Sequence, residues 1–106
     1  MNSWAVEFTN EAKRDMCDFN RTQRLQISKA INKVSKNPLP SSEGGYGKPL
    51  GNRSTNLTGL LKIKLLKLGI RVVYKLAQAD GVKKIIVVAA RANDEVYEIA
   101  ARRLDP

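Results

Sequence analysis

The side chains best suited to chemistry in this sequence are lysines and arginines that alternate with apolar residues. Lys62 and Lys64 stand in the motif LKIKL, and Arg71 and Lys75 stand in the motif IRVVYKL a few residues later. Ammonium and guanidinium groups bind phosphate oxygens, so this pattern fits a phosphate-binding surface and a solvated basic sheet face equally well. The chain contains no histidine, so any acid–base chemistry must use Lys, Tyr, Asp, Glu or Arg.

These four cations meet only if the two motifs pair in a suitable register. Both motifs alternate apolar and basic residues with the period of a half-buried strand, which predicts a hairpin. A two-residue turn at Leu68-Gly69 would place Lys62 opposite Lys75, and any turn with an even number of residues would put all four cations on one face. An odd turn would bury some of the charges, which costs several kcal/mol in order of magnitude. The sequence therefore predicts a basic patch on one face of a sheet.

Three residues near the C-terminus, Arg91, Asn93 and Tyr97, add to this pattern. Arg91 follows an apolar segment, and Asn93 stands at the start of a predicted helix, where side-chain and backbone donors converge on a phosphate. Tyr97 lies one turn into that helix. Packing is the commoner role of a lone tyrosine, so its spacing alone assigns Tyr97 no chemistry.

The elements that must position these residues follow from periodicity and from capping residues. Strands are predicted at 3–9, 60–66, 70–76 and 85–90, and helices from residue 9 or 10, at 21–36, and from residue 93 or 94. The order β-α-α-β-β-β-α predicts an α+β fold with a small antiparallel-rich sheet, an N-terminal helical hairpin and a C-terminal helix. Residues 1–106 are expected to form a single domain. The loop at 37–56 holds three of the four prolines and four of the seven glycines, so it is either disordered or functional.

The composition of the chain indicates which kinds of binding partner and which cellular compartment to expect. Nineteen Lys and Arg against ten Asp and Glu give a formal net charge of +9, which favours polyanions or acidic proteins as partners. No stretch reaches the roughly 18 apolar residues of a membrane span, and the start lacks a hydrophobic signal core, so a cytoplasmic protein is expected. The single cysteine, Cys17, cannot form an internal disulfide, and a structural zinc site is excluded. The simplest role of Cys17 is that of a small core residue.

Taken together, the motifs LLKIKLLKLGIRVVYKL and ARANDEVYEIAARRL and the apolar strand between them resemble the RelE branch of the RelE/ParE toxin superfamily. The resemblance extends from Trp4 to Leu104 in the order of elements. It implies the toxin of a type II toxin–antitoxin system, a ribosome-dependent endoribonuclease that cleaves mRNA in the ribosomal A site and is neutralised by a cognate antitoxin. The positions that carry this activity in the family match Lys62, Lys64, Arg71, Arg91 and Tyr97.

The residues are compatible with RNA cleavage that uses neither a metal nor another cofactor. The RNA 2′-hydroxyl can attack the adjacent phosphate if the site supplies a base, charge stabilisation and an acid. A lysine crowded by cations has a lowered pKa and suits the base, while the arginines suit charge stabilisation. Tyr97 could orient the 2′-hydroxyl, transfer a proton or stack on a base. Which lysine is the base, and which group is the acid, stays open.

Such a site is incomplete for a fast nuclease acting alone, which favours a partner, here the ribosome, that presents the RNA. Further cations would then contact RNA, namely Lys48, Arg53, Lys75, Arg102 and Arg103. Two alternatives remain: a ParE-like inhibitor of DNA gyrase, which would leave mRNA uncut, and a nucleic-acid-binding protein without catalytic activity.

Overall fold

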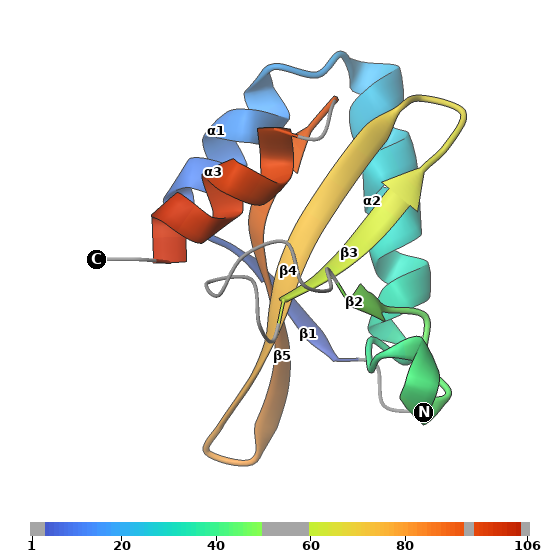
Figure 1. The fold of residues 1–106 in the computed structure, drawn as a ribbon, viewed down its shortest axis with the longest axis vertical. Helices are drawn as coiled ribbons and strands as arrows, with labels where there is room; N and C mark the ends of the chain where they lie inside the picture. The colour runs from blue at the N-terminus through green and yellow to red at the C-terminus, as the bar shows by residue number, and fades with distance from the viewer. Residues whose placement is uncertain (1–3, 50–59, 93–94, 105–106) are drawn as a thin grey trace.

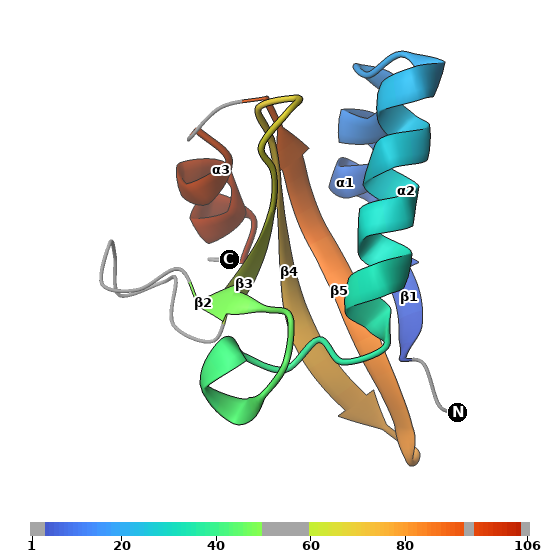
Figure 2. The same ribbon diagram turned by 90° about the vertical axis from the view of Figure 1, so that its right-hand side faces the viewer.

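The protein is a mixed five-stranded sheet between two helical layers (Figures 1 and 2). The structure, a computed structural model, describes residues 4–49, 60–92 and 95–104. The elements are β1 (Ala5–Phe8), α1 (Asn10–Cys17), α2 (Arg21–Ser35), η1 (Ser41–Glu43), β2 (Lys48–Pro49), β3 (Leu60–Leu65), β4 (Ile70–Ala79), β5 (Val82–Arg91) and α3 (Glu95–Leu104). The strands lie in the order β1-β5-β4-β3-β2, with β1 parallel to β5 and the other neighbours antiparallel. The predicted α+β order is confirmed, and η1 and β2 are additional elements within the predicted loop.

Local capping sets the two N-terminal helices. The hydroxyl oxygen of Thr9 accepts a hydrogen bond from the Ala12 amide at 3.0 Å and begins α1. Asn20 and Gln23 form a reciprocal capping box, with both bonds at 2.8 Å, and begin α2. Each cap satisfies amide groups that have no partner inside the helix. The chain reverses direction between α1 and α2, and both helices pack on the same face of the sheet (Figure 2).

The sheet separates two hydrophobic clusters. The larger one joins α1 and α2 to the sheet and includes Ile27, Ile31, Val72 and Val87. The smaller one lies under α3 on the other face, and its members are Leu60, Val73, Val88, Ala89, Val96, Tyr97 and Ala100. The face predicted to be basic is therefore covered by α3 in part, and its cations stand around that covered area.

The hairpin between β3 and β4 corrects one predicted register. Leu65 pairs with Ile70, so the turn contains four residues, 66–69, and Lys62 lies opposite Val73 instead of opposite Lys75. A two-residue turn of the primed type would require positive φ at Leu68, which is costly for a residue with a Cβ atom. In the four-residue turn, positive φ falls on Gly69 at +67°. The turn still has an even number of residues, so the predicted gathering of cations on one face is confirmed.

The hairpin between β4 and β5 follows its sequence signal. Asp80 and Gly81 have φ values of 54° and 77°, as a two-residue primed turn requires. Further along, Tyr74 pairs with Val87 whereas Val73 pairs with Ala89, so Val88 is an extra residue in β5. This β-bulge changes which side chains of β5 face α3.

Candidate active site

Three cations form one row across the sheet, beside the turn that joins β3 to β4. Lys64 in β3 lies opposite Arg71 in β4, and Arg71 lies opposite Arg91 in β5. Directly opposed residues share a face, and neighbouring strands are about 4.8 Å apart, so this cation row spans about 10 Å. Without the bulge at Val88, regular pairing would put Ala90 opposite Arg71 and turn Arg91 to the other face. The bulge is thus what completes the cation row.

Two lysines continue the positive face beside the row. Lys62 lies two residues from Lys64 on the same side of β3, and Lys48 in β2 lies directly opposite Lys62. Like charges in opposed positions destabilise a sheet, and this face holds three such pairs. Neutral polar residues at these positions would avoid this repulsion. We interpret this arrangement as a site built to meet a polyanion.

The cations of the row are partly held by the protein. The guanidinium of Arg71 donates a hydrogen bond to the Gly69 carbonyl oxygen at 2.9 Å. Arg91 has a third of its side chain exposed, 34%, and its Nη2 lies 3.1 Å from the Asp15 carboxylate. Lys64 is exposed. The row is therefore fixed at its β5 end and open to solvent at its β3 end.

Asp15 is a buried acidic residue beside the cation row that was not among the predicted site residues. Its carboxylate is 2% exposed and accepts hydrogen bonds from the Ala90 amide at 3.0 Å and from Nη1 of Arg103 at 2.7 Å, besides pairing with Arg91. In Figure 2 the end of β5 lies between α1 and α3. The contacts of Asp15 with Ala90, Arg91 and Arg103 join these three elements. The bond to Asp15 raises the pKa of Arg103. A signal existed in the sequence, because Asp15 falls on the apolar stripe that begins at Ala12.

Arginines also gather in a cleft between α1 and α3. The cleft has a volume of ≈ 530 Å³ and is lined by Glu11, Arg91, Ile99, Arg102 and Arg103. Arg91 belongs both to this arginine cleft and to the cation row. Arg102 is exposed, whereas Arg103 is mostly enclosed and donates to Asp15 and to the Val88 carbonyl oxygen. Arg103 therefore joins α3 to α1 and β5 and also lines the cleft, and its contact with RNA stays a prediction.

Tyr97 lies beneath the basic face. It is 2% exposed and packs in the cluster under α3. The Lys62 ammonium nitrogen stands 5.5 Å from the centroid of its ring, a cation–π distance. In this conformation the ring supports Lys62 and does not present a surface on which a base could stack.

The remaining predicted residues divide by position. Lys75 lies on the same face as the cation row, opposite Leu60. Arg53 and the predicted helix start at Asn93 fall outside the described residues. The prediction that Cys17 is a core residue is wrong, because its side chain is exposed.

Within residues 4–49, 60–92 and 95–104, acidic and cysteine side chains form no group of three that could hold a metal ion. In the same residues, no helix is long and apolar enough to cross a membrane.

Comparison with known proteins relates this geometry to one family of toxins. A RelE-like toxin of Escherichia coli is 24% identical over 102 residues, which cover 95% of this chain and 97% of that protein. A mutant of the E. coli toxin RelE in the free state superposes with a TM-score of 0.70 at 24% identity, covering 96% of this chain and 98% of that one. No protein-family model matches the chain.

Two solved complexes have the same fold. The RelE mutant bound to a peptide of its antitoxin RelB has a TM-score of 0.59 at 25% identity, covering 93% of this chain and 95% of that one. The intact E. coli RelBE toxin–antitoxin complex has a TM-score of 0.62 at 22% identity, covering 83% of this chain and 94% of that one. The resemblance to RelE-type toxins that the motifs indicated is confirmed, and the fold is theirs.

Proposed function

From the RelE fold and the RelE-like sequence, we propose that this chain is the toxin of a type II toxin–antitoxin system. It is a ribosome-dependent endoribonuclease that cleaves mRNA in the ribosomal A site and stops translation, and it acts in the cytoplasm, where ribosomes are. The observation that carries the proposal is the cation row, in which an even turn, a β-bulge and a buried carboxylate bring Lys64, Arg71 and Arg91 to one face.

The row suits the charge changes of RNA cleavage by the 2′-hydroxyl. When that oxygen attacks the adjacent phosphate, the 2′-proton leaves and negative charge grows on the phosphoryl oxygens before the bond to the 5′-oxygen breaks. Arg71 and Arg91 offer pre-oriented N–H donors to those oxygens. The amines of Lys62 and Lys64 stand beside them and can transfer protons. Tyr97 supports Lys62 through its ring.

The chemistry of the side chains favours a reaction without a metal ion. A divalent cation would be repelled by the surrounding ammonium and guanidinium groups, which themselves supply the positive charge that phosphoryl transfer requires. The site contains no histidine, so its proton transfer depends on positioning, which the ribosome provides by holding the mRNA. Lys48, Lys75 and Arg102 extend the positive surface toward the surrounding RNA.

The test is primer extension on a defined mRNA with the purified protein, on translating ribosomes and free in solution. We expect cleavage at the A-site codon only with ribosomes, and a loss of at least about 100-fold in Lys64→Ala and in Arg91→Ala. Lys83 lies at the start of β5, at the other end of the strand from Arg91. Lys83→Ala is therefore the matched control and should cleave mRNA normally. Absence of cleavage in both conditions would contradict the proposal. Inhibition of gyrase, or RNA binding without cleavage, would then indicate one of the two alternatives.

A further inference from the structure

Arg103 in α3 joins its helix to a carboxylate in α1 and to the end of β5. Its two terminal nitrogens donate to the two carboxylate oxygens of Asp15, at 2.7 Å and 3.0 Å. Nη1 also donates to the Val88 carbonyl oxygen at 2.8 Å. Paired bonds between a guanidinium and a carboxylate fix the relative orientation of both groups. The side chain of Arg103 is 17% exposed and that of Asp15 is 2% exposed, so water hardly reaches this ion pair.

These bonds form where β5 has a neighbouring strand on one side only. β1 ends opposite Val87, and past that residue no strand of the described sheet lies beside β5 on the β1 side. Val88 is the extra residue of the bulge and is fully buried. A buried backbone group without a hydrogen-bond partner is costly. Arg103 binds the Val88 carbonyl, and Asp15 accepts from the Ala90 amide at 3.0 Å, so the ion pair stabilises the bulge.

Arg91 follows this segment directly and shares its carboxylate. The Asp15 oxygen that lies 3.1 Å from Nη2 of Arg91 is the one that accepts from Nη2 of Arg103. We propose that Arg103 is a positioning residue, which acts through Asp15 and the bulge to hold Arg91 in the cation row. This inference rests on the proposed function, in which Arg91 stabilises the charge that grows on the RNA. Arg103 itself acts without touching the substrate.

Direct contact with RNA is the alternative role of Arg103. Both of its terminal nitrogens already donate to protein oxygens, so a phosphate would have to compete with a buried carboxylate and a backbone carbonyl. Arg102 lines the same arginine cleft and is exposed, which suits it better to that contact. The two roles differ in kinetics. A positioning residue sets the rate of cleavage at saturation, whereas an RNA contact sets the concentration at which saturation is reached.

The first measurement is amide hydrogen exchange of the purified protein, which needs neither RNA nor ribosomes. We expect Arg103→Gln to speed the exchange of the Ala90 amide at least about tenfold, because its acceptor, Asp15, is no longer held. The Ile85 amide, in the part of β5 that lies between β1 and β4, should keep its protection. Arg102→Gln, the same change at the exposed neighbour, should leave both amides unaffected. Unchanged exchange at Ala90 in Arg103→Gln, or equal acceleration at Ile85, would overturn the proposal.

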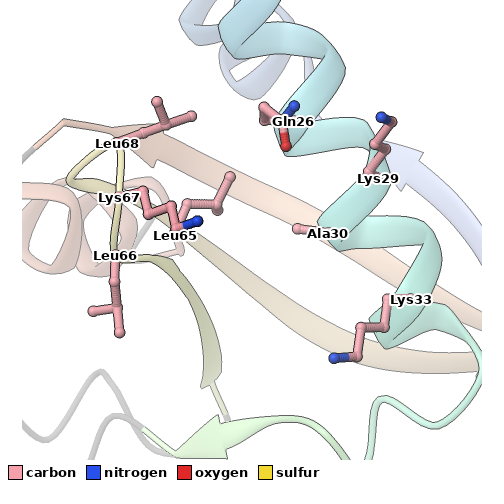
Figure 3. A pocket seen from close by; sticks show the side chains of 8 residues that line it. All are labelled: Gln26, Lys29, Ala30, Lys33, Leu65, Leu66, Lys67 and Leu68. Atoms are coloured by element: carbon pink, nitrogen blue, oxygen red, sulfur yellow. The ribbon is translucent and has the colours of Figure 1, made fainter.

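The second measurement is single-turnover cleavage of mRNA on ribosomes at increasing concentrations of the protein. Arg103→Gln should lower the rate at saturation about 10- to 100-fold and leave the half-saturating concentration unchanged. The double variant Asp15→Asn/Arg103→Gln leaves no unpaired buried charge and should lose about as much as Asp15→Asn alone. The matched control is Lys29→Gln. Lys29 lies on α2 and lines the hollow beside the turn at 66–69 (Figure 3), and this variant should cleave normally.

Two kinetic results would contradict the positioning role. A raised half-saturating concentration with an unchanged rate at saturation in Arg103→Gln would indicate an RNA contact instead. Losses that multiply in the double variant would show that Arg103 does not act through Asp15. If the unchanged protein cleaves no mRNA, the proposed function fails, and the exchange of the Ala90 amide still decides whether Arg103 holds the end of β5.

Discussion

Under the proposed function, the buried side chain of Asp15 positions Arg91 for catalysis. Its carboxylate holds Arg91 at 3.1 Å. Asp15→Asn keeps the shape but removes the charge, so Arg91 loses its anchor. A misplacement of about 1 Å can lower a rate about 100-fold, and we expect a loss of that order in single-turnover cleavage on ribosomes.

A double-mutant cycle separates this positioning role from a role in folding. If Asp15 acts through Arg91, Asp15→Asn should add little to the loss already caused by Arg91→Ala, since coupled residues are not additive. Asp18, with 72% of its side chain exposed and 3.7 Å from Arg91, provides the control, and Asp18→Asn should cleave almost normally. Fully additive losses for Asp15→Asn and Arg91→Ala would show that Asp15 acts on the fold alone.

At the scale of strands, the cation row lowers the stability of the sheet, because its opposed cations repel each other. Lys64 faces Arg71 across β3 and β4, and a like-charge pair in this position costs about 0.2–1 kcal/mol. Lys64→Gln should therefore raise the free energy of unfolding by a few tenths of a kcal/mol while it abolishes cleavage, and the gain should shrink at high salt. Urea denaturation at low and high salt measures the effect. A loss of stability in Lys64→Gln would show that Lys64 has a structural partner that outweighs the repulsion.

The strands also show what the sequence could predict. Alternation alone predicted the apolar and basic faces of β3 and β4, because a shift of one residue would bury charge. It could not distinguish a two-residue turn from a four-residue turn, since both preserve the faces, and so it paired Lys62 with the wrong residue. The bulge at Val88 lies in an unbroken apolar run that carries no alternation. The partners of Asp15 lie 75 and 88 residues away in sequence, beyond the reach of any local pattern.

At the scale of the whole molecule, Tyr74 ties the sheet to the segment that follows α2. Its side chain is fully buried, at 0% exposure, and its hydroxyl donates to the Pro38 carbonyl oxygen at 2.8 Å. Burial raises the pKa of the Tyr74 phenol. Above about pH 10 the unfolded chain releases this proton while the folded chain keeps it, so the unfolded state gains stability as the pH rises.

Global stability should therefore fall above about pH 10, with a contribution from Tyr74 of up to about 1.4 kcal/mol per pH unit, and should be unaffected by this group below it. Tyr74→Phe should cost about 1 kcal/mol at neutral pH through the lost hydrogen bond and should show a shallower alkaline decline. Urea denaturation of both proteins at several pH values checks this. Parallel alkaline declines in the two proteins would exclude Tyr74 as the cause.

The bulge in β5 sets how the end of this strand aligns with β4, and without the bulge the pairing would shift by one residue. Ala89 and Ala90 would exchange faces between these two alignments, methyl group for methyl group, so neither hydrophobic cluster distinguishes them strongly. The alignments differ in whether Arg91 faces Arg71 and in whether the Ala90 amide points toward Asp15 or toward β4. The contacts of Asp15 with the Ala90 amide and with Arg91 thus favour the observed alignment, which places Arg91 in the cation row.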